Sequence, residues 1–226
     1  MPKAVKARRG YVSALRTEQA RATRARIITA ARDRLEKRGY AATTIAEIAL
    51  AAKVSPESVY ATFSSKRELL AQMIAVSISG ADEAVPMLQR GWVETMRRLP
   101  GGAERLRYWI GHTCETLERT SQVHALIHDA VISEPALAGL RRQHQEFRLR
   151  VQTRLMGLIE EGGGAPLRRS VAKSAQTFWA LASPELHRLL RVDRGWSKSR
   201  YRDWLTDALE TLIWDTPVSG SGTSRT

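Results

Sequence analysis

Few residues of this chain are arranged for covalent catalysis. Cys114 is its only cysteine, and the histidine nearest to it in sequence is His112. Residues two positions apart on a helix do not face each other, so this pair cannot form an activated thiolate. The sequence contains no HExxH or GxSxG motif, and the glycine run at 162–164 lacks the GK[ST] of a phosphate-binding loop. We therefore expect a protein that is not an enzyme.

Two histidines could bind a metal ion together. His124 and His128 are one helical turn apart, so both side chains could approach the same ion. Two ligands on one helix face do not complete a site, and such a pair is more often plain surface. The single cysteine also excludes an intramolecular disulfide and a four-cysteine zinc site. We expect neither a metal nor a cofactor.

Aromatic residues are concentrated in the second part of the chain. All six tryptophans lie beyond residue 70, at positions 92, 109, 179, 196, 204 and 214. Aromatic-lined pockets between helices bind apolar molecules, although most of these tryptophans could instead belong to a core or a dimer interface. Trp109, His112 and Cys114 share one predicted helix. They are our candidates for the wall of a ligand pocket.

The charge of the chain points to a polyanionic partner. The formal net charge is +13, and residues 1–70 hold 15 Lys and Arg against 6 Asp and Glu, while the remainder is nearly balanced. A basic surface can simply aid solubility, but a basic front end on a balanced body favours nucleic acid. Thr43 and Thr44 stand at the start of a predicted helix, where hydroxyls and free amides suit phosphate.

That helix is the first of two short helices joined by a tight turn. Thr44 is its predicted N-cap, and Glu47 completes a capping box. Ile45, Ile48 and Ala49 form a narrow apolar stripe at helical spacing. The chain breaks at residues 52–54. The helix capped by Thr44 is expected to pack against and support the helix that follows.

The second helix is predicted to run from about Pro56 to Thr62. Ser55 is the hydroxyl cap, Pro56 takes the first helical position, and Glu57 places a carboxylate in the first turn. Val59 and Phe63 are expected to turn inward. Two such helices match a helix-turn-helix, in which the second helix enters the major groove of DNA.

Linked elements at fixed spacing carry a family resemblance. They are Gly39-Tyr40-Ala41-Ala42-Thr43-Thr44-Ile45, Glu47-Ile48-Ala49, Val54-Ser55, Val59-Tyr60 and Phe63-Ser64-Ser65-Lys66. From about Arg24 to Leu70 the sequence resembles the N-terminal domain of TetR-family repressors. The resemblance implies a DNA-binding domain, a helical regulatory body and a pocket for a small apolar effector.

The resemblance also implies the residues that contact DNA. The expected set is Thr43, Thr44, Ser55, Pro56, Glu57, Ser58, Tyr60, Thr62 and Lys66. Many members of the family carry a basic residue at the position of Pro56 and a small residue at that of Glu57. A carboxylate in the groove repels phosphate, although it could accept a hydrogen bond from cytosine N4. The alternative position for Tyr60 is half-buried in the core.

The rest of the chain is expected to be helical, so the predicted class is all-α. The first helix spans about residues 22–37, and Ser65 and Glu68 form a capping box for a fourth helix. Beyond these, predicted helices cover 87–99, 103–119, 122–132, 135–161, 169–182 and 197–214, with a further short helix beginning at 183–185. The helix at 135–161 is predicted to be the longest. Its stripe, and that of either 169–182 or 197–214, are candidates for a dimer seam or for the protein's own core.

The predicted organisation has four parts. Residues 1–22 form a basic flexible arm that is either disordered or lies along DNA, 23–70 the three-helix DNA-binding domain, 71–215 the helical ligand-binding and dimerisation domain, and 216–226 a disordered tail. No apolar run is long enough for a membrane span, and no signal-peptide core follows the basic N-terminus, so we expect a cytoplasmic bacterial protein.

These patterns predict a homodimeric, ligand-responsive transcriptional repressor that binds a palindromic operator in double-stranded DNA. Two alternatives stay open. A nucleoid-type protein would bind DNA through its basic arm without sequence preference. A helical ligand-binding enzyme would need a nucleophile and base that the sequence does not display. The sequence does not distinguish repression from activation.

Overall fold

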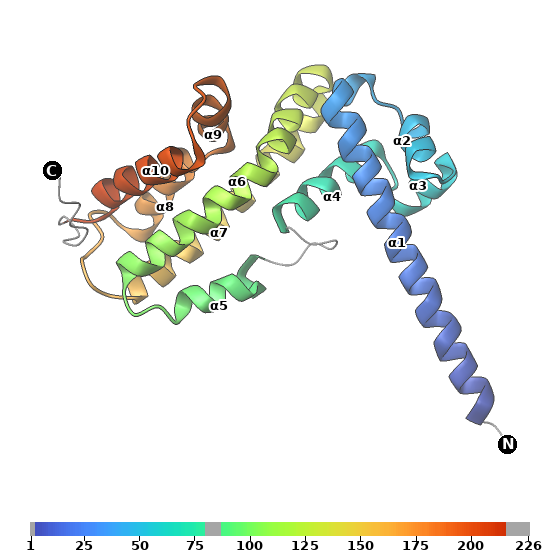
Figure 1. The fold of residues 1–226 in the computed structure, drawn as a ribbon, viewed down its shortest axis with the longest axis horizontal. Helices are drawn as coiled ribbons and strands as arrows, with labels where there is room; N and C mark the ends of the chain where they lie inside the picture. The colour runs from blue at the N-terminus through green and yellow to red at the C-terminus, as the bar shows by residue number, and fades with distance from the viewer. Residues whose placement is uncertain (1–2, 80–86, 216–226) are drawn as a thin grey trace.

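The computed structural model describes residues 3–79 and 87–215, and in these ranges the chain is built from helices (Figure 1). The described residues form no strand; one isolated bridge pairs Leu167 with Trp214. No helix in these two ranges is both long and apolar enough to cross a membrane. The all-α prediction is confirmed. The predicted tail at 216–226 lies outside the described residues.

Helix α1 (Lys3–Ala42) is longer than predicted. We expected a flexible arm before a helix starting near Ala22, but residues 3–22 continue the same helix, which projects away from the other helices in Figure 1. The physical reason lies in the composition of the segment before Ala22: Ala, Arg, Glu and Gln are strong helix formers. The packed part of α1 supplies the nucleus from which the helix extends. At Gly39 the backbone leaves helical geometry with φ 76°.

The two short helices form as the capping residues predict. In α2 (Ile45–Ala52) Thr44 and Glu47 make the reciprocal capping box, and Lys53 ends the helix with φ 57°. In α3 (Pro56–Thr62) the Ser55 hydroxyl accepts a hydrogen bond from the Ser58 amide at 3.2 Å. Because each helix is short, its apolar side must be buried to hold it.

Helix α4 (Lys66–Ser79) closes this N-terminal domain against α1. The Arg24 guanidinium donates to Gln72 Oε1 at 2.8 Å, and Arg32 donates to the Ser77 hydroxyl at 2.5 Å. The domain core contains buried residues of all four helices, and also Val123, Leu126 and Ala130 of α6 (Gly102–Ser133). The DNA-binding domain is therefore completed by a helix of the body.

The body contains the remaining helices. They are η1 (Met87–Gln89), α5 (Gly91–Arg97), α6, η2 (Pro135–Leu137), α7 (Ala138–Glu161), α8 (Val171–Leu181), α9 (Pro184–Arg188), the π-helical turn η3 (Leu189–Asp193) and α10 (Lys198–Ile213). Their shared core includes Met156 of α7, Phe178 of α8 and Leu205 of α10. Helix α6 lies between the two domains and contacts α1, α4, α7, α9 and α10.

Helix α6 differs from the prediction because it is continuous through residues 120–121. We expected two helices separated there. The Thr120 hydroxyl instead donates to the Thr116 carbonyl at 2.8 Å, which leaves the helical backbone pattern intact. With 32 residues α6 is also longer than α7, which has 24, so the prediction that 135–161 is the longest helix was wrong.

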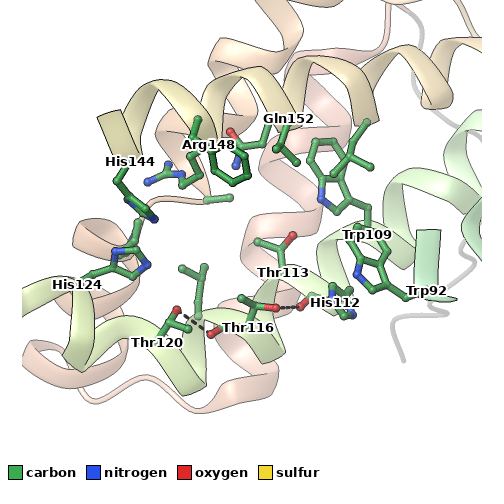
Figure 2. Close-up of a pocket in the computed structure, with 16 residues that line it drawn as sticks. Trp92, Trp109, His112, Thr113, Thr116, Thr120, His124, His144, Arg148 and Gln152 are labelled. Carbon is green, nitrogen blue, oxygen red and sulfur yellow. Dashed lines mark hydrogen bonds between the residues drawn. The ribbon is translucent and has the colours of Figure 1, made fainter. Parts of the chain in front are cut away.

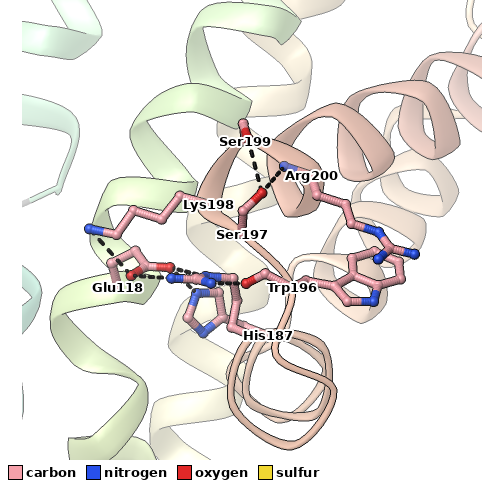
Figure 3. Close-up of polar contacts among 8 residues, drawn as sticks. Glu118, His187, Trp196, Ser197, Lys198, Ser199 and Arg200 are labelled. Carbon is pink, nitrogen blue, oxygen red and sulfur yellow. Dashed lines mark hydrogen bonds and ion pairs between the residues drawn. The ribbon is translucent and has the colours of Figure 1, made fainter.

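A partly exposed polar cluster links α6 to the C-terminal elements (Figure 3). The Glu118 carboxylate accepts from Arg191 of η3 at 2.5 Å, contacts His187 of α9 at 3.1 Å, and pairs with Lys198 of α10 at 3.6 Å. The hydrogen bond from Arg191, with a smaller contribution from His187, lowers the pKa of the Glu118 carboxyl to about 2. One carboxylate thus connects four elements.

A substitution at the start of α6 tests how closely this helix packs against the end of α7. A Cβ on Gly102 would lie 2.7 Å from the Ile159 carbonyl oxygen and 2.9 Å from that of Gly163. Because backbone atoms cannot move aside cheaply, we expect Gly102→Ala to lower the free energy of unfolding by about 1–3 kcal/mol. Thermal and urea unfolding would measure it.

The matched control is Gly111→Ala in the same helix. A Cβ there meets nothing within 4 Å, so alanine should raise stability by about 0.5–1 kcal/mol through its helix propensity. Equal effects of the two substitutions would contradict the close seating of Gly102.

Candidate functional site

The first turn of α3 and the N-cap of α2 form an exposed polar surface. Thr44, Ser55, Pro56 and Glu57 are exposed, and Ser58 is half-buried. Tyr60 has 53% of its surface exposed, so it does not occupy the core position that we weighed as its alternative. Val59 and Phe63 face inward and are buried, as predicted. Burial of Val59 and Phe63 anchors α3 to the core, and the first turn of α3 stays exposed to a binding partner.

Thr43 does not belong to this surface. Its side chain is 1% exposed, and its hydroxyl donates to the Gly39 carbonyl at 2.8 Å. The prediction of a phosphate contact for this hydroxyl must be corrected, because the kink at Gly39 turns Thr43 under the end of α1. Thr44 retains a surface position next to the free amides of α2.

Two further predicted contacts have local partners. The Lys66 ammonium donates to the Tyr40 carbonyl and lies 4.0 Å from the centre of the Tyr40 ring. The Thr62 hydroxyl donates to the Ser58 carbonyl at 2.8 Å. Both side chains are half-buried. In this conformation Lys66 positions α4 against the end of α1, and a phosphate would compete with that bond.

The electrostatics of the surface are mixed. Hydrogen bonds to its own backbone amide and to Ser55 lower the pKa of the Glu57 carboxyl, so it is ionised at neutral pH. Lys53 is exposed at the turn between α2 and α3 and brings a positive charge that our predicted set omitted. Its place in the turn of a helix-turn-helix was the signal that could have identified it.

A second candidate site is a cavity of about 90 Å³ inside the body (Figure 2). Its walls come from α5, α6 and α7, with Ala182 and Pro184 beside α8 and α9. The lining residues are Trp92, Trp109, His112, Thr113, Thr116, Leu117, Thr120, His124, His144, Phe147, Arg148, Val151, Gln152, Leu155, Ala182 and Pro184. Eight of these sixteen residues are apolar or aromatic, and the other eight are polar: Thr113, Thr116, Thr120, His112, His124, His144, Arg148 and Gln152. An apolar wall with placed polar groups suits a small molecule.

Aromatic stacking fixes one end of the cavity. Trp92 of α5 stacks on His112 of α6 with ring centres 4.1 Å apart, and Trp109 stacks on Phe178 of α8 at 3.7 Å. At the other end His124 of α6 meets His144 of α7, with ring centres 4.9 Å apart. Figure 2 shows His144, Arg148 and Gln152 projecting from α7 towards the threonines of α6.

Burial dominates the protonation of the cavity. It lowers the pKa of His112 and of His144 to about 4, and that of His124 to about 3, so all three rings are neutral at pH 7. Burial also lowers the pKa of Arg148, to about 10, which leaves its guanidinium charged. Arg148 therefore provides the positive charge in the lining of this cavity.

Only two of the three predicted pocket residues line the cavity. Trp109 and His112 line the cavity, whereas Cys114 packs in the body core on another side of α6. A rotation of 100° per residue explains this, since positions 112 and 114 point in different directions. Burial raises the pKa of the Cys114 thiol to about 11, so the thiol is protonated and poorly nucleophilic at neutral pH.

The two predicted histidines differ in burial, although both line a second pocket beside α9. His124 faces the cavity, while His128 is exposed. Within the described ranges, no group of three His, Cys, Asp or Glu side chains could hold a metal ion together.

The polar groups from α7 were missed by the sequence reasoning. His144, Arg148 and Gln152 recur every four residues, which places them on one helix face. That spacing was readable, but we did not single out these three residues. A repeating polar residue within an apolar stripe was the signal.

The comparisons with known proteins agree with this arrangement. Residues 27–73 match the family model described as bacterial regulatory proteins, tetR family. This range contains α2, α3 and the packed part of α1 and α4. The N-terminal domain matches the TetR-family model, and the match does not extend into the body. The comparison with curated protein sequences gives no match.

Solved structures similar to the chain include regulators of the TetR family. A proposed TetR-family transcriptional regulator of Rhodococcus sp. has a TM-score of 0.66 at 18% identity, covering 85% of this chain and 98% of that one. The transcriptional regulator FadR from Bacillus subtilis, in complex with stearoyl-CoA, has a TM-score of 0.65 at 15% identity, covering 83% and 98%.

A third similar structure is NalD, the secondary repressor of the MexAB-OprM multidrug efflux pump in Pseudomonas aeruginosa. It has a TM-score of 0.59 at 17% identity, covering 87% of this chain and 98% of that one. At these identities the similarity is one of fold. The chain has the fold of a TetR-family transcriptional regulator, with its DNA-binding helix-turn-helix at the N-terminus.

Tyr60 provides a test of the surface of this N-terminal domain. Its ring is half exposed and outside the core, so Tyr60→Ala should change the free energy of unfolding by no more than about 0.5 kcal/mol. We expect its affinity for DNA to fall about tenfold, through loss of a phosphate contact. Fluorescence anisotropy on duplex DNA would measure the affinity.

Tyr60→Phe is the matched control because it keeps the ring and removes the hydroxyl. A loss as large as that of alanine assigns the contact to the hydroxyl. Unchanged DNA affinity in both variants would remove Tyr60 from the interface.

Proposed function

We propose that this chain is a homodimeric, ligand-responsive transcriptional repressor that binds a palindromic operator through α3. The observation that carries the proposal is the course of α6. Between Trp109 and His124 this helix lines the cavity, and from Val123 to Ala130 it packs in the core of the DNA-binding domain. One rigid element therefore belongs to both sites.

This geometry supports coupling by a shift in population. A ligand in the cavity contacts both α6 and α7, so it favours conformations in which those helices are separated to fit it. The packed end of α6 transmits any displacement to α1 and α4, since Val123, Leu126 and Ala130 are buried among their side chains. A ligand that prefers the non-binding conformation by about 1.4 kcal/mol lowers DNA affinity up to tenfold.

The outward faces of α8 and α10 support a two-fold dimer. These two helices pack against each other, and each also carries apolar residues on the side away from the core. Leu212 is 46% exposed, Ala180 is exposed and Ala208 is half-buried. The stripe of α7 buries Leu155, Met156 and Ile159 in its own chain, so of the predicted seams we retain α8 and α10.

The dimer would place two copies of α3 about one turn of DNA apart, which requires a palindromic site. Repression, as named for NalD, is the mode that we propose. A protein acting on a bacterial chromosome works in the cytoplasm, and we propose this location.

A charge at Leu212 tests the dimer. We expect Leu212→Glu to raise the dimer dissociation constant by about 30-fold or more, since an unpaired carboxylate would be buried in the seam. Sedimentation velocity would measure the oligomeric state. Ile132→Glu is the control, because Ile132 is 74% exposed on α6, away from both helices. If both variants remain dimers like the wild type, the seam lies elsewhere.

Selection of bound sequences from a random duplex pool tests the proposed function directly. At near-physiological salt we expect a recovered palindrome with two half-sites one helical turn apart, because the dimer presents two equivalent helices. Binding that falls steeply with salt and enriches no sequence would instead identify a non-specific DNA-binding protein. Absence of binding at low salt would contradict both functions.

A further inference from the structure

The polar end of the cavity contains a charged group without a counter-ion. The Arg148 guanidinium donates to the Trp179 carbonyl and lies 4.9 Å from the centre of the Trp179 ring. No described carboxylate lies within ion-pair distance of it, although the more distant Glu185 favours its charged form. Its Nε atom is buried and makes no hydrogen bond to any described residue.

Neighbouring polar atoms are left unpaired in the same way. Of ten buried side-chain N and O atoms that lack a partner among the described residues, four line this one cavity. They belong to Trp92, His144, Arg148 and Gln152. Each unpaired group of this kind destabilises the fold by about 1–3 kcal/mol. Three of the four lie on one face of α7, at His144, Arg148 and Gln152, while Trp92 lies at the other end of the cavity; a molecule bound at this face of α7 would satisfy its unpaired donors.

Two of these atoms are donors on one face of α7 and together select an acceptor, whereas Gln152 Oε1 is itself an acceptor. Arg148 Nε carries a hydrogen, and the neutral ring of His144 can carry one on Nε2, so both can donate. Both residues project from the same face of α7, one turn apart (Figure 2). A carboxylate has two oxygens that accept such hydrogen bonds, and its charge would neutralise the guanidinium.

The remainder of the lining is suited to an apolar body. Leu117 of α6 and Val151 and Leu155 of α7 continue the wall from Arg148 towards the stacked Trp109. The volume of about 90 Å³ is smaller than the roughly 150 Å³ of a cavity that binds benzene. A ring or short chain would therefore have to separate α6 from α7 on entering.

We propose that the effector is a small hydrophobic carboxylic acid whose carboxylate binds Arg148 and His144 and whose apolar part lies towards Trp109. This inference rests on the proposed ligand response and names its chemical class. The need to separate α6 from α7 gives the acid its preference for a displaced α6, and thereby its effect on DNA binding.

Matched ligand pairs test the inference. The probes are 4-phenylbutanoate and octanoate, each compared with its neutral primary amide, and binding is measured by calorimetry and by fluorescence of the cavity tryptophans. We expect at least one acid to bind about 30-fold more tightly than its amide, because the amide leaves the guanidinium unpaired. Equal affinity of acid and amide, or no binding of either acid, would overturn the proposal.

Arg148→Met should abolish the preference for the acid while leaving amide binding unchanged. Arg150→Gln is the control, since Arg150 is exposed on the same helix and should keep the preference. Because Arg148 is a buried unpaired charge, we also expect Arg148→Met to unfold at a temperature no lower than the wild type. A large loss of stability, with the acid preference intact in the remaining folded protein, would assign Arg148 a structural role and overturn the inference.

An assay of DNA release by added ligands distinguishes failure of this inference from failure of the proposed function. Release by a neutral or cationic ligand that ignores Arg148 would support ligand-responsive regulation and overturn the carboxylate assignment. Binding of an acid that depends on Arg148, without release of DNA, would support the assignment and contradict the regulatory response.

Discussion

The packing of α6 against both domains is the constraint on which the rest of the structure depends. Val123, Leu126 and Ala130 complete the core of the DNA-binding domain, and from Trp109 to His124 the same helix forms a wall of the cavity. Because an α-helix resists bending, a displacement at one end must appear at the other unless the helix breaks. Glu118 holds the middle of α6 to α9, η3 and α10, which limits the directions in which it can move.

The helix-turn-helix is held by local interactions, whereas the cavity depends on packing between segments that are distant in sequence. The residues that we propose to face DNA are held locally, by caps at Thr44 and Ser55 and by inward-facing Val59 and Phe63. The cavity is formed by residues from helices that are distant in sequence, and four of its buried polar atoms lack partners among the described residues. Unpaired groups are destabilising, so their presence at one place fits a site that exchanges stability for ligand binding.

Charge is distributed in a way that suits these two roles. The basic excess lies in the first seventy residues, where a polyanion is the expected partner, and Glu57 places one ionised carboxylate within that surface. Inside the body, burial keeps His112, His124 and His144 neutral, so Arg148 provides the positive charge of the cavity at neutral pH. Any selectivity for an anion in this cavity therefore depends mainly on one side chain.

The sequence by itself determined the short-range features of this protein. Caps, prolines and apolar spacing act over four or five residues, so α2, α3 and the inward positions of Val59 and Phe63 could be predicted. Tertiary structure decided what depends on distant packing: the burial of Thr43, the inward bond of Lys66 and the separation of Cys114 from the cavity. It also joined α6 into one helix and brought Arg148 opposite the threonines of α6, since residues far apart in sequence meet only through the fold.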